Sequence, residues 1–198
     1  VGERSARLLA RRFASLDALT AASAEQLEDV EGVGPVVAAA VAAWLDNAGN
    51  RALLVRLRER GIDPTDGPDL VAVIEAQRER ASTLIELAEI SLFYYRDFAT
   101  LDAKAAKKAL KPDADKALDA ARGNVSALPH WQRDALHKAV AETVEQLGVG
   151  FGKVAMPLRV AVTGGAPSPD LDLTLYLVGR ESCLRRIDKA ITYIESAA

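Results

Sequence analysis

The sequence contains few aromatic residues, a single cysteine and no apolar run long enough to span a bilayer. Aromatic residues make up 5% of the 198 residues, whereas Ala and Leu supply much of an apolar fraction of 49%. Because Ala and Leu favour helices, while strands are enriched in aromatic and β-branched residues, this composition predicts an all-α fold. The lone Cys183 excludes an internal disulfide and a zinc site built from cysteines.

The sequence also lacks a signal-like segment at its start and an excess of basic residues. Without a signal segment or a spanning run, we expect a cytoplasmic protein with no membrane contact. The formal net charge is −3, with basic and acidic residues equally numerous up to Ile62 and acidic residues in excess after it. Nucleic-acid binders usually present a basic face, so charge alone indicates no such partner unless the cations gather on one side.

The stretch from Asn50 to Pro68 divides the chain. Apolar residues recur at helical spacing where it begins, and Gly61 occupies the place of a helix C-cap. The prolines, aspartates and glycine between Asp63 and Pro68 then disfavour regular structure. We therefore expect two domains, residues 1–62 and 63–198.

A Gly-x-Gly turn at residues 32–34 is the most informative feature of the first domain. A capping-box pattern at Ser23 and Gln26 opens a short helix before the turn, and Pro35 starts a second helix that is expected to reach about Asp46. Glycines let the backbone approach a phosphate closely, and the N-terminus of the second helix favours an anion. A bare Gly-x-Gly is also typical of a tight turn between packed helices.

Apolar residues are spaced on both sides of this turn so that the segment resembles the helix-hairpin-helix motif. The sequence up to about Ile62 resembles the last part of the helix-hairpin-helix domain of bacterial NAD-dependent DNA ligases. In that family the domain contacts DNA phosphates through backbone amides and catalyses nothing. The resemblance implies this contact role for Gly2, Gly32, Val33 and Gly34. The first half of the hairpin at Gly2 and the ligase catalytic domain are absent, so we expect that first site to be impaired and ligation to be impossible.

An aromatic run in the second domain allows two interpretations. Phe93, Tyr94 and Tyr95 beside Arg96 could stack on unpaired bases. Such a run is more often helix core, which is the interpretation we favour.

Neither the basic strip nor the histidines of the second domain indicate a site by themselves. The strip is either a solvated helix face, which we favour, or a surface for phosphates; it comprises Lys104, Lys107, Lys108 and Lys111. His130 and His137 lie seven residues apart, unlike a helical metal pair, so we expect no metal and no cofactor.

The most distinctive run of the second domain is at residues 153–177. Pro157 is tolerated best near a helix start, so we expect a helix that begins just before it, carries Arg159 in its first turns and stops at Gly164. Residues 171–177 alternate like a strand, but an N-cap and N1 proline at Ser168 and Pro169 favour a helix.

From about Gly61 to its end the sequence resembles the C-terminal anticodon-binding region of bacterial glutamyl-tRNA synthetases, a helical class I synthetase domain. Long strings match in register, among them GKVAMPLRVAVTGGAPSPDLDLTLYLVGRES and LRRIDKAITYI. The resemblance implies that the domain receives a tRNA anticodon loop. Arg159, Ser168, Pro169 and Leu171 would contact its bases. For Arg159 a surface ion pair is the alternative. The catalytic domain of that family is absent.

Together these resemblances predict a helical protein without enzymatic activity that binds DNA weakly through the hairpin and tRNA weakly through the second domain. Since the sequence begins inside a hairpin and joins modules of two families, we interpret it as an engineered chimera or a recombined fragment. The alternative is a folded scaffold that binds nothing appreciable; an adaptor function has no specific support. The oligomeric state is left open.

Overall fold

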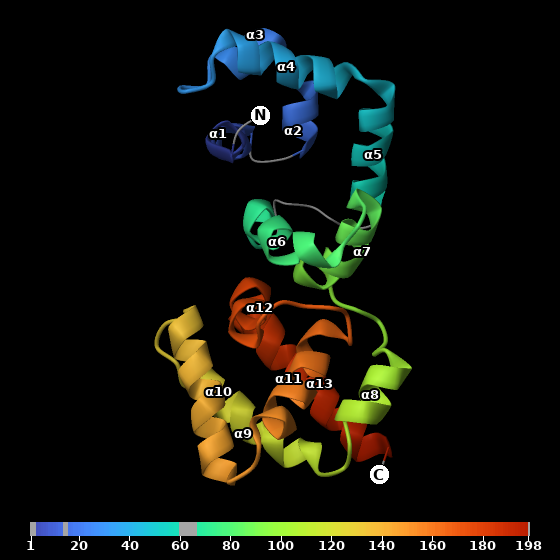
Figure 1. The fold of residues 1–198 in the computed structure, drawn as a ribbon, viewed down its shortest axis with the longest axis vertical. Coiled ribbons are helices and arrows are strands. Elements are labelled where there is room, and N and C mark those ends of the chain that lie inside the picture. Colours follow the sequence, from blue (N-terminus) through green and yellow to red (C-terminus); the bar gives the residue numbers. More distant parts are fainter. Residues whose placement is uncertain (1–2, 14–15, 60–66, 198) are drawn as a thin grey trace. The chain divides into compact units, whose positions relative to one another are not determined.

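In the computed structural model, residues 3–13, 16–59 and 67–197 are described, and they form helices joined by turns with no strand among them (Figure 1). This confirms the all-α prediction. Gly2, Gly61 and the expected boundary at residues 62 and 63 lie outside the described residues. No helix in the described ranges is both long and apolar enough to cross a membrane.

Contacts divide the chain into two compact units, Val1–Val71 and Ala72–Ala198, here called the N-terminal unit and the C-terminal unit. The helices of the N-terminal unit are α1 (Glu3–Phe13), α2 (Leu16–Ala21), α3 (Ala24–Glu28), α4 (Pro35–Asp46) and α5 (Ala48–Glu59). Those that follow are α6 (Leu70–Gln77), the 3₁₀ helix η1 (Arg78–Arg80), α7 (Leu84–Tyr95), α8 (Ala103–Ala109), α9 (Ala114–Ser126), α10 (Arg133–Leu147), α11 (Phe151–Thr163), α12 (Leu171–Val178) and α13 (Arg180–Ala197).

The N-terminal unit is built around the pair α3 and α4. Ser23 caps α3 as predicted: its hydroxyl accepts from the Gln26 N–H at 3.2 Å, and the Gln26 side chain accepts from the Ser23 N–H at 2.9 Å. The buried residues form one cluster, comprising Leu9, Leu27, Val30, Val33, Ala38, Val41 and Leu45. The apolar spacing on both sides of the glycine turn therefore packs two short helices against each other, as a helix hairpin requires.

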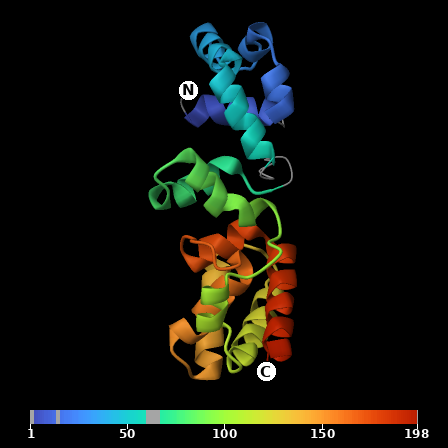
Figure 2. The same ribbon diagram turned by 90° about the vertical axis from the view of Figure 1, so that its right-hand side faces the viewer.

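In the C-terminal unit, α11 packs against α8, α9, α10, α12 and α13. Figures 1 and 2 show α13 running beside α9 and α11. The core includes the fully buried Leu118, Leu136, Leu158, Leu175 and Ile187. Side chains that α11 directs away from this core are consequently held on a rigid, well-packed helix.

The aromatic run of α7 belongs to the core, as expected. Phe93 and Tyr94 are buried, with ring centroids 4.0 Å apart. At the start of α7, Thr83 accepts from the Glu86 N–H at 3.1 Å, and the Glu86 carboxylate accepts from the N–H of Ser82. Tyr95 is partly buried and packs against the same core. The run therefore belongs to the core, as favoured over a stacking platform.

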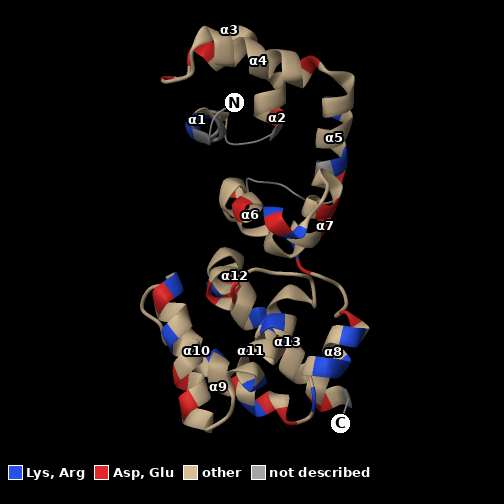
Figure 3. Cartoon of the chain, in the orientation of Figure 1, with Lys and Arg blue, Asp and Glu red and all other residues tan. Residues whose placement is uncertain are grey.

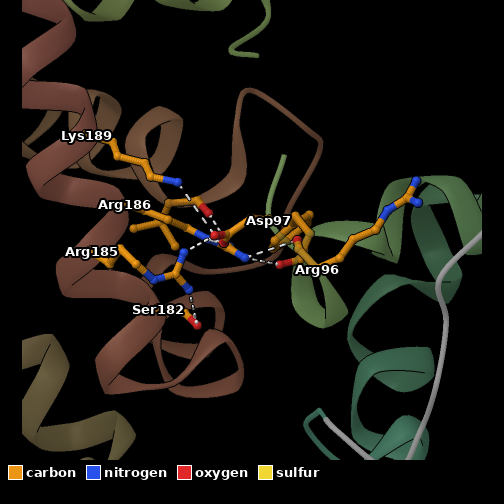
Figure 4. Close-up of polar contacts among 8 residues, drawn as sticks. Arg96, Asp97, Ser182, Arg185, Arg186 and Lys189 are labelled. Carbon is orange, nitrogen blue, oxygen red and sulfur yellow. Dashed lines mark hydrogen bonds and ion pairs between the residues drawn. The ribbon is translucent and has the colours of Figure 1, made fainter. Parts of the chain in front are cut away.

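A buried arginine of α13 ties three helices together. Arg186 is only 4% exposed and donates to the carbonyls of Val162 at 2.7 Å, Phe93 at 2.8 Å and Arg96 at 3.2 Å, and to the Asp97 carboxylate at 3.0 Å. Burial lowers its pKa to about 10, so it remains a cation at neutral pH. Figure 4 shows Asp97 at the centre of the cluster, while the Arg96 side chain extends away from it.

Arg185 and Lys189 also approach Asp97, Lys189 with its Nζ 3.7 Å from the carboxylate. Both cations are about half exposed or more, at 47% and 62% of their side chains. Asp97 therefore has one buried partner and two exposed ones (Figure 4).

Candidate nucleic-acid interface

The hairpin turn of the N-terminal unit has the backbone geometry that the glycines predicted. Gly32 has a φ of 86°, and a Cβ there would lie 3.0 Å from the Cδ1 of Leu8. Gly34 is the N-cap of α4, with a φ of −82° and nothing within 4 Å of a Cβ position. Gly32 is thus required by conformation and packing, whereas Gly34 leaves open space beside the helix N-terminus.

Three amides remain available at this turn. Within the described residues, the N–H groups of Gly32, Gly34 and Val36 make no hydrogen bond, and all three residues are exposed. Val33 differs from the role implied for it: it is 5% exposed, and its N–H donates to the Val30 carbonyl at 2.8 Å. Val33 therefore packs the hairpin, and the free donors are those of its neighbours.

The residues that flank the hairpin turn in the sequence are unfavourable for an anion. Glu28, Asp29 and Glu31 are exposed just before the turn, and the sequence has no lysine or arginine between Phe13 and Asn50. The free amides and the helix N-terminus favour a phosphate, while the three carboxylates repel it.

The helix that carries Arg159 begins earlier than predicted. α11 starts at Phe151, with Gly150 as N-cap, so Pro157 lies inside it and the prediction of a start just before Pro157 was wrong. A proline removes one helical hydrogen bond, here the one to the carbonyl of Lys153. Lys153 is exposed and Pro157 is buried, so water can reach this region while the ring fills the core. The predicted stop is confirmed by Gly164, the C-cap with a φ of 72°.

Arg159 therefore lies in the middle of α11 rather than in its first turns. Its Nη1 donates to the Ser168 carbonyl at 3.2 Å, to the Ser168 hydroxyl and to the Pro169 carbonyl. It is half-buried; burial lowers its pKa, and the nearby Asp170 acts in the opposite direction. Among the described residues it forms no ion pair. The guanidinium instead binds the segment before α12.

The structure brings all four residues of the predicted base-binding set together. Ser168 and Pro169 precede α12, whose N-cap is Asp170 rather than Ser168, and the helix predicted over residues 171–177 is present. Ser168 is half-buried, Pro169 is buried, and Leu171 is 6% exposed and belongs to the core. Arg159 and Ser168 are therefore the members that offer polar groups near the surface.

Gln77 is a positioning residue of this segment that no sequence pattern indicates. It is fully buried at the end of α6, and its Nε2 donates to the carbonyls of Pro167 at 3.0 Å and Ile90 at 3.2 Å. Pro167 lies 90 residues away along the chain, so no local pattern marks the contact.

Further contacts fix the loop at its two ends. The Gly164 carbonyl accepts from the Asp102 N–H at 2.8 Å, and the Asp170 carbonyl accepts from the Thr174 hydroxyl at 2.9 Å. The loop from Gly164 to Asp170 is consequently held from α6, α8, α11 and α12.

Two hollows in the C-terminal unit share Arg159. One, with a volume of about 490 Å³, is lined by Arg80, Lys108 and Arg159 together with residues 165–168. The other, of about 370 Å³, is lined by Arg133, His137, Phe151, Asp170, Leu171 and Asp172 besides Arg159. Phe151 is 53% exposed. The first hollow offers cations without a carboxylate, and the second offers an aromatic face with polar groups of both signs.

The remaining predicted features are on the surface. Lys104, Lys107, Lys108 and Lys111 are all exposed, and so are His130 and His137. No group of three or more His, Cys, Asp and Glu side chains in the described part of the chain could hold a metal ion.

The comparisons with known proteins agree with the fold of both units. A family model described as an anticodon binding domain matches residues 36–191, and one described as a helix-hairpin-helix motif matches residues 1–54. The two matched ranges overlap, so the family models do not place a domain boundary at residue 62.

Among curated proteins, glutamate–tRNA ligase 1 of Alkalilimnicola ehrlichii is 51% identical over 148 residues, which cover 75% of this chain and 31% of that protein. The chain thus spans about a third of this relative's length.

Two solved structures have a similar fold. The glutamate tRNA ligase of Elizabethkingia meningosepticum, solved in complex with its amino acid, has a TM-score of 0.60 at 24% identity and covers 79% of this chain and 32% of its own. The glutamate-tRNA synthetase of Elizabethkingia anophelis has a TM-score of 0.55 at 21% identity and covers 95% and 40%.

Proposed function

Because this chain belongs to the anticodon binding domain family, we propose that its C-terminal unit binds the anticodon loop of a glutamate tRNA and catalyses no reaction itself. The observation that carries this proposal is the position of Arg159, a half-buried cation that lines two adjoining hollows and fixes the loop between them. Proteins read RNA sequence mostly from unstacked bases in loops, which they stack on flat side chains and contact through polar groups.

Each hollow supplies a different part of such recognition. Lys108, Arg80 and Arg159 offer donors to base oxygens or to phosphate. On the other side of Arg159, the exposed ring of Phe151 offers a stacking surface, and Asp170 offers acceptors to exocyclic amines. Asp172 already pairs with Arg133 at 2.8 Å. Ser168 lines the first hollow, and Pro169 follows it in the chain. The carbonyls of both residues already accept from Arg159, so both act by holding that guanidinium in place.

A binding titration tests this proposal. A fluorescent anticodon stem-loop of glutamate tRNA is compared with one whose anticodon bases are exchanged. We expect the chain to prefer the first, and Arg159→Ala to weaken that binding about 10-fold or more and to reduce the preference. Arg122→Ala is the control, because Arg122 is a partly exposed cation that pairs with Asp188 and lines neither hollow.

Three outcomes bear on the proposal. Equal loss of affinity in the two arginine variants would refute a specific role for Arg159. Binding of the two stem-loops with equal affinity would refute recognition of the anticodon. Absence of binding to either at low salt would favour a folded scaffold without a ligand.

A second candidate function is phosphate contact with DNA by the hairpin, as in the ligase domain that the first 62 residues resemble. The free N–H groups of Gly32, Gly34 and Val36 favour it. Glu28, Asp29 and Glu31 limit such binding to a weak interaction. Gly34→Ala is a suitable test because a Cβ meets no atom within 4 Å in the protein. We expect it to reduce binding of nicked duplex DNA; unchanged binding would exclude this contact.

The chimeric interpretation belongs with this second candidate. If the hairpin of the N-terminal unit retains a DNA role and the C-terminal unit a tRNA role, the chain combines two binding modules. A chimera whose core is continuous across the junction is expected to unfold in one cooperative transition, and two well-separated transitions would show that the units unfold independently.

A further inference from the structure

We propose that the surface formed by α8, α9 and the first half of α11 binds the phosphates of the RNA strand that flanks the anticodon. This rests on the proposed function, since the RNA is the one whose bases lie at Arg159. It goes beyond that function by assigning a role to four lysines, of which Lys108 and Lys111 belong to the strip that we interpreted from the sequence as a solvated helix face.

The surface is a third hollow, of about 570 Å³, with four lysines and one acid in its lining. The lysines are Lys108, Lys111, Lys116 and Lys153, and the acid is Asp113. Asp113 pairs with Lys153 at 3.4 Å, and the two side chains are 68% and 66% exposed. Exposed pairs of this kind contribute about 0–1 kcal/mol, so a phosphate can replace the carboxylate at little cost.

The other lysines have no competing partner. Within the described residues, the side chains of Lys108, Lys111 and Lys116 take part in no hydrogen bond or ion pair, and all three are exposed. They come from α8, the turn after it and α9. Figure 3 shows Lys and Arg positions along α8 and near the adjoining end of α11.

This hollow is continuous with the one at Arg159. Lys108, Ala109 and Met156 line both. The joined surface therefore contains six cations and one carboxylate in a chain whose net charge is −3. Cations therefore outnumber carboxylates in this surface, whereas acidic residues outnumber basic ones in the rest of the sequence. Such a local excess of cations is the condition under which the overall composition allows a nucleic-acid partner.

The chemistry of the surface favours a nucleic-acid strand over a single phosphate. The lysines are spread over separate elements rather than converging, and between them lie the apolar side chains of Val149, 38% exposed, and Met156, 41% exposed. A chain of regularly spaced charges with apolar sugar and base faces between them fits this alternation. Because this hollow is continuous with the one at Arg159, the strand would run from the lysines toward the bases bound at Arg159.

The test is the salt dependence of stem-loop binding. For single strands, the slope of log K against log salt changes by about 0.7 for each phosphate contact. We therefore expect the triple variant K108Q/K111Q/K116Q to reduce the slope by about 2 and the affinity at 0.1 M salt by on the order of 100-fold. The control removes the same charge from other exposed positions through R96Q/K138Q/K189Q.

The outcomes separate this inference from the proposed function. If the unmodified chain binds the stem-loop and both triple variants lose the same slope, the effect is one of overall charge and the inference is refuted. If neither variant changes the slope, it is refuted as well, while anticodon binding stands. If the unmodified chain binds no stem-loop at low salt, both proposals fail. Thermal unfolding of each variant confirms that the comparison is between folded proteins.

Discussion

Replacement of Arg186 by methionine removes a buried cation while keeping a side chain of similar length. The methionine can fill the space but cannot donate. The carbonyls of Val162 and Phe93 then lose a donor in a buried position, and Asp97 loses its buried partner.

The magnitude follows from these three losses. A buried acceptor left unsatisfied costs about 1–3 kcal/mol, so the two carbonyls account for about 2–6 kcal/mol. Asp97 adds less than a fully buried acid would, because it is 36% exposed and retains Arg185 and Lys189. We expect a loss of about 3–5 kcal/mol, within the range measured for breaking a buried pair. This is a large part of the 5–15 kcal/mol that typically stabilises a domain.

Arg185→Met is the matched control, since Arg185 binds the same carboxylate from the adjacent position with 47% of its side chain exposed. An exposed pair contributes about 0–1 kcal/mol, so its loss should hardly matter. Urea denaturation followed by the fluorescence of Trp131, in a Trp44→Phe background, reports on the C-terminal unit. With a slope of about 1.5 kcal/mol/M, the midpoint should fall by about 2–3 M for Arg186→Met. Similar shifts for both variants would refute the reasoning.

Three other predictions concern the glycines and the cysteine. Gly148 and Gly164 both have positive φ, so replacing either by Ala should cost about 1–2 kcal/mol of stability. Gly164→Ala should cost at least about 1 kcal/mol more, because its Cβ would lie 2.8 Å from the Phe98 ring. Equal melting temperatures of the two variants would contradict this. Gly32→Ala should lower the stability of the N-terminal unit by about 1–2 kcal/mol and Gly34→Ala by under about 0.5, measured by Trp44 fluorescence in urea. Burial raises the pKa of Cys183 to about 12, so the stability that its neutral thiol contributes is complete below pH 9 and declines between about pH 9 and 12. Ellman's reagent should label this thiol at pH 8 only after the protein unfolds. Rapid labelling of the native protein would contradict this, because it would show that the thiol is accessible.

Features encoded within one or two helical turns could be predicted from the sequence. Ser23 and Gln26 lie three residues apart and meet as a capping box because both partners belong to the same turn. Gly164 ends its helix because the left-handed conformation at that position depends on the residue itself. The α12 helix was favoured over a strand for a similar reason, although its N-cap is Asp170 and not Ser168.

Predictions from the local sequence failed where packing in the folded protein compensates for a residue that disfavours the local structure. Pro157 suggested a helix start, but its ring is buried, and packing of α11 on five other helices stabilises the turns on both sides of it. For Arg159, the sequence pointed to the correct neighbourhood through a resemblance; its hydrogen bonds to Ser168 and Pro169 depend on the path of the loop. Gln77 and Arg186 act through partners about 90 residues away, and no periodicity or motif reports such distances.

The loop from Gly164 to Asp170 is fixed by hydrogen bonds with Gln77, Arg159 and Thr174. An RNA that binds here as proposed would not have to order this loop, so the entropy lost on binding would come mainly from the RNA. Association should then proceed in one kinetic phase whose rate is proportional to RNA concentration, with no later isomerisation of the protein. Loosening the loop at Gln77 would introduce a folding step into binding and shorten the lifetime of the complex, although Gln77 is too deeply buried to touch the RNA.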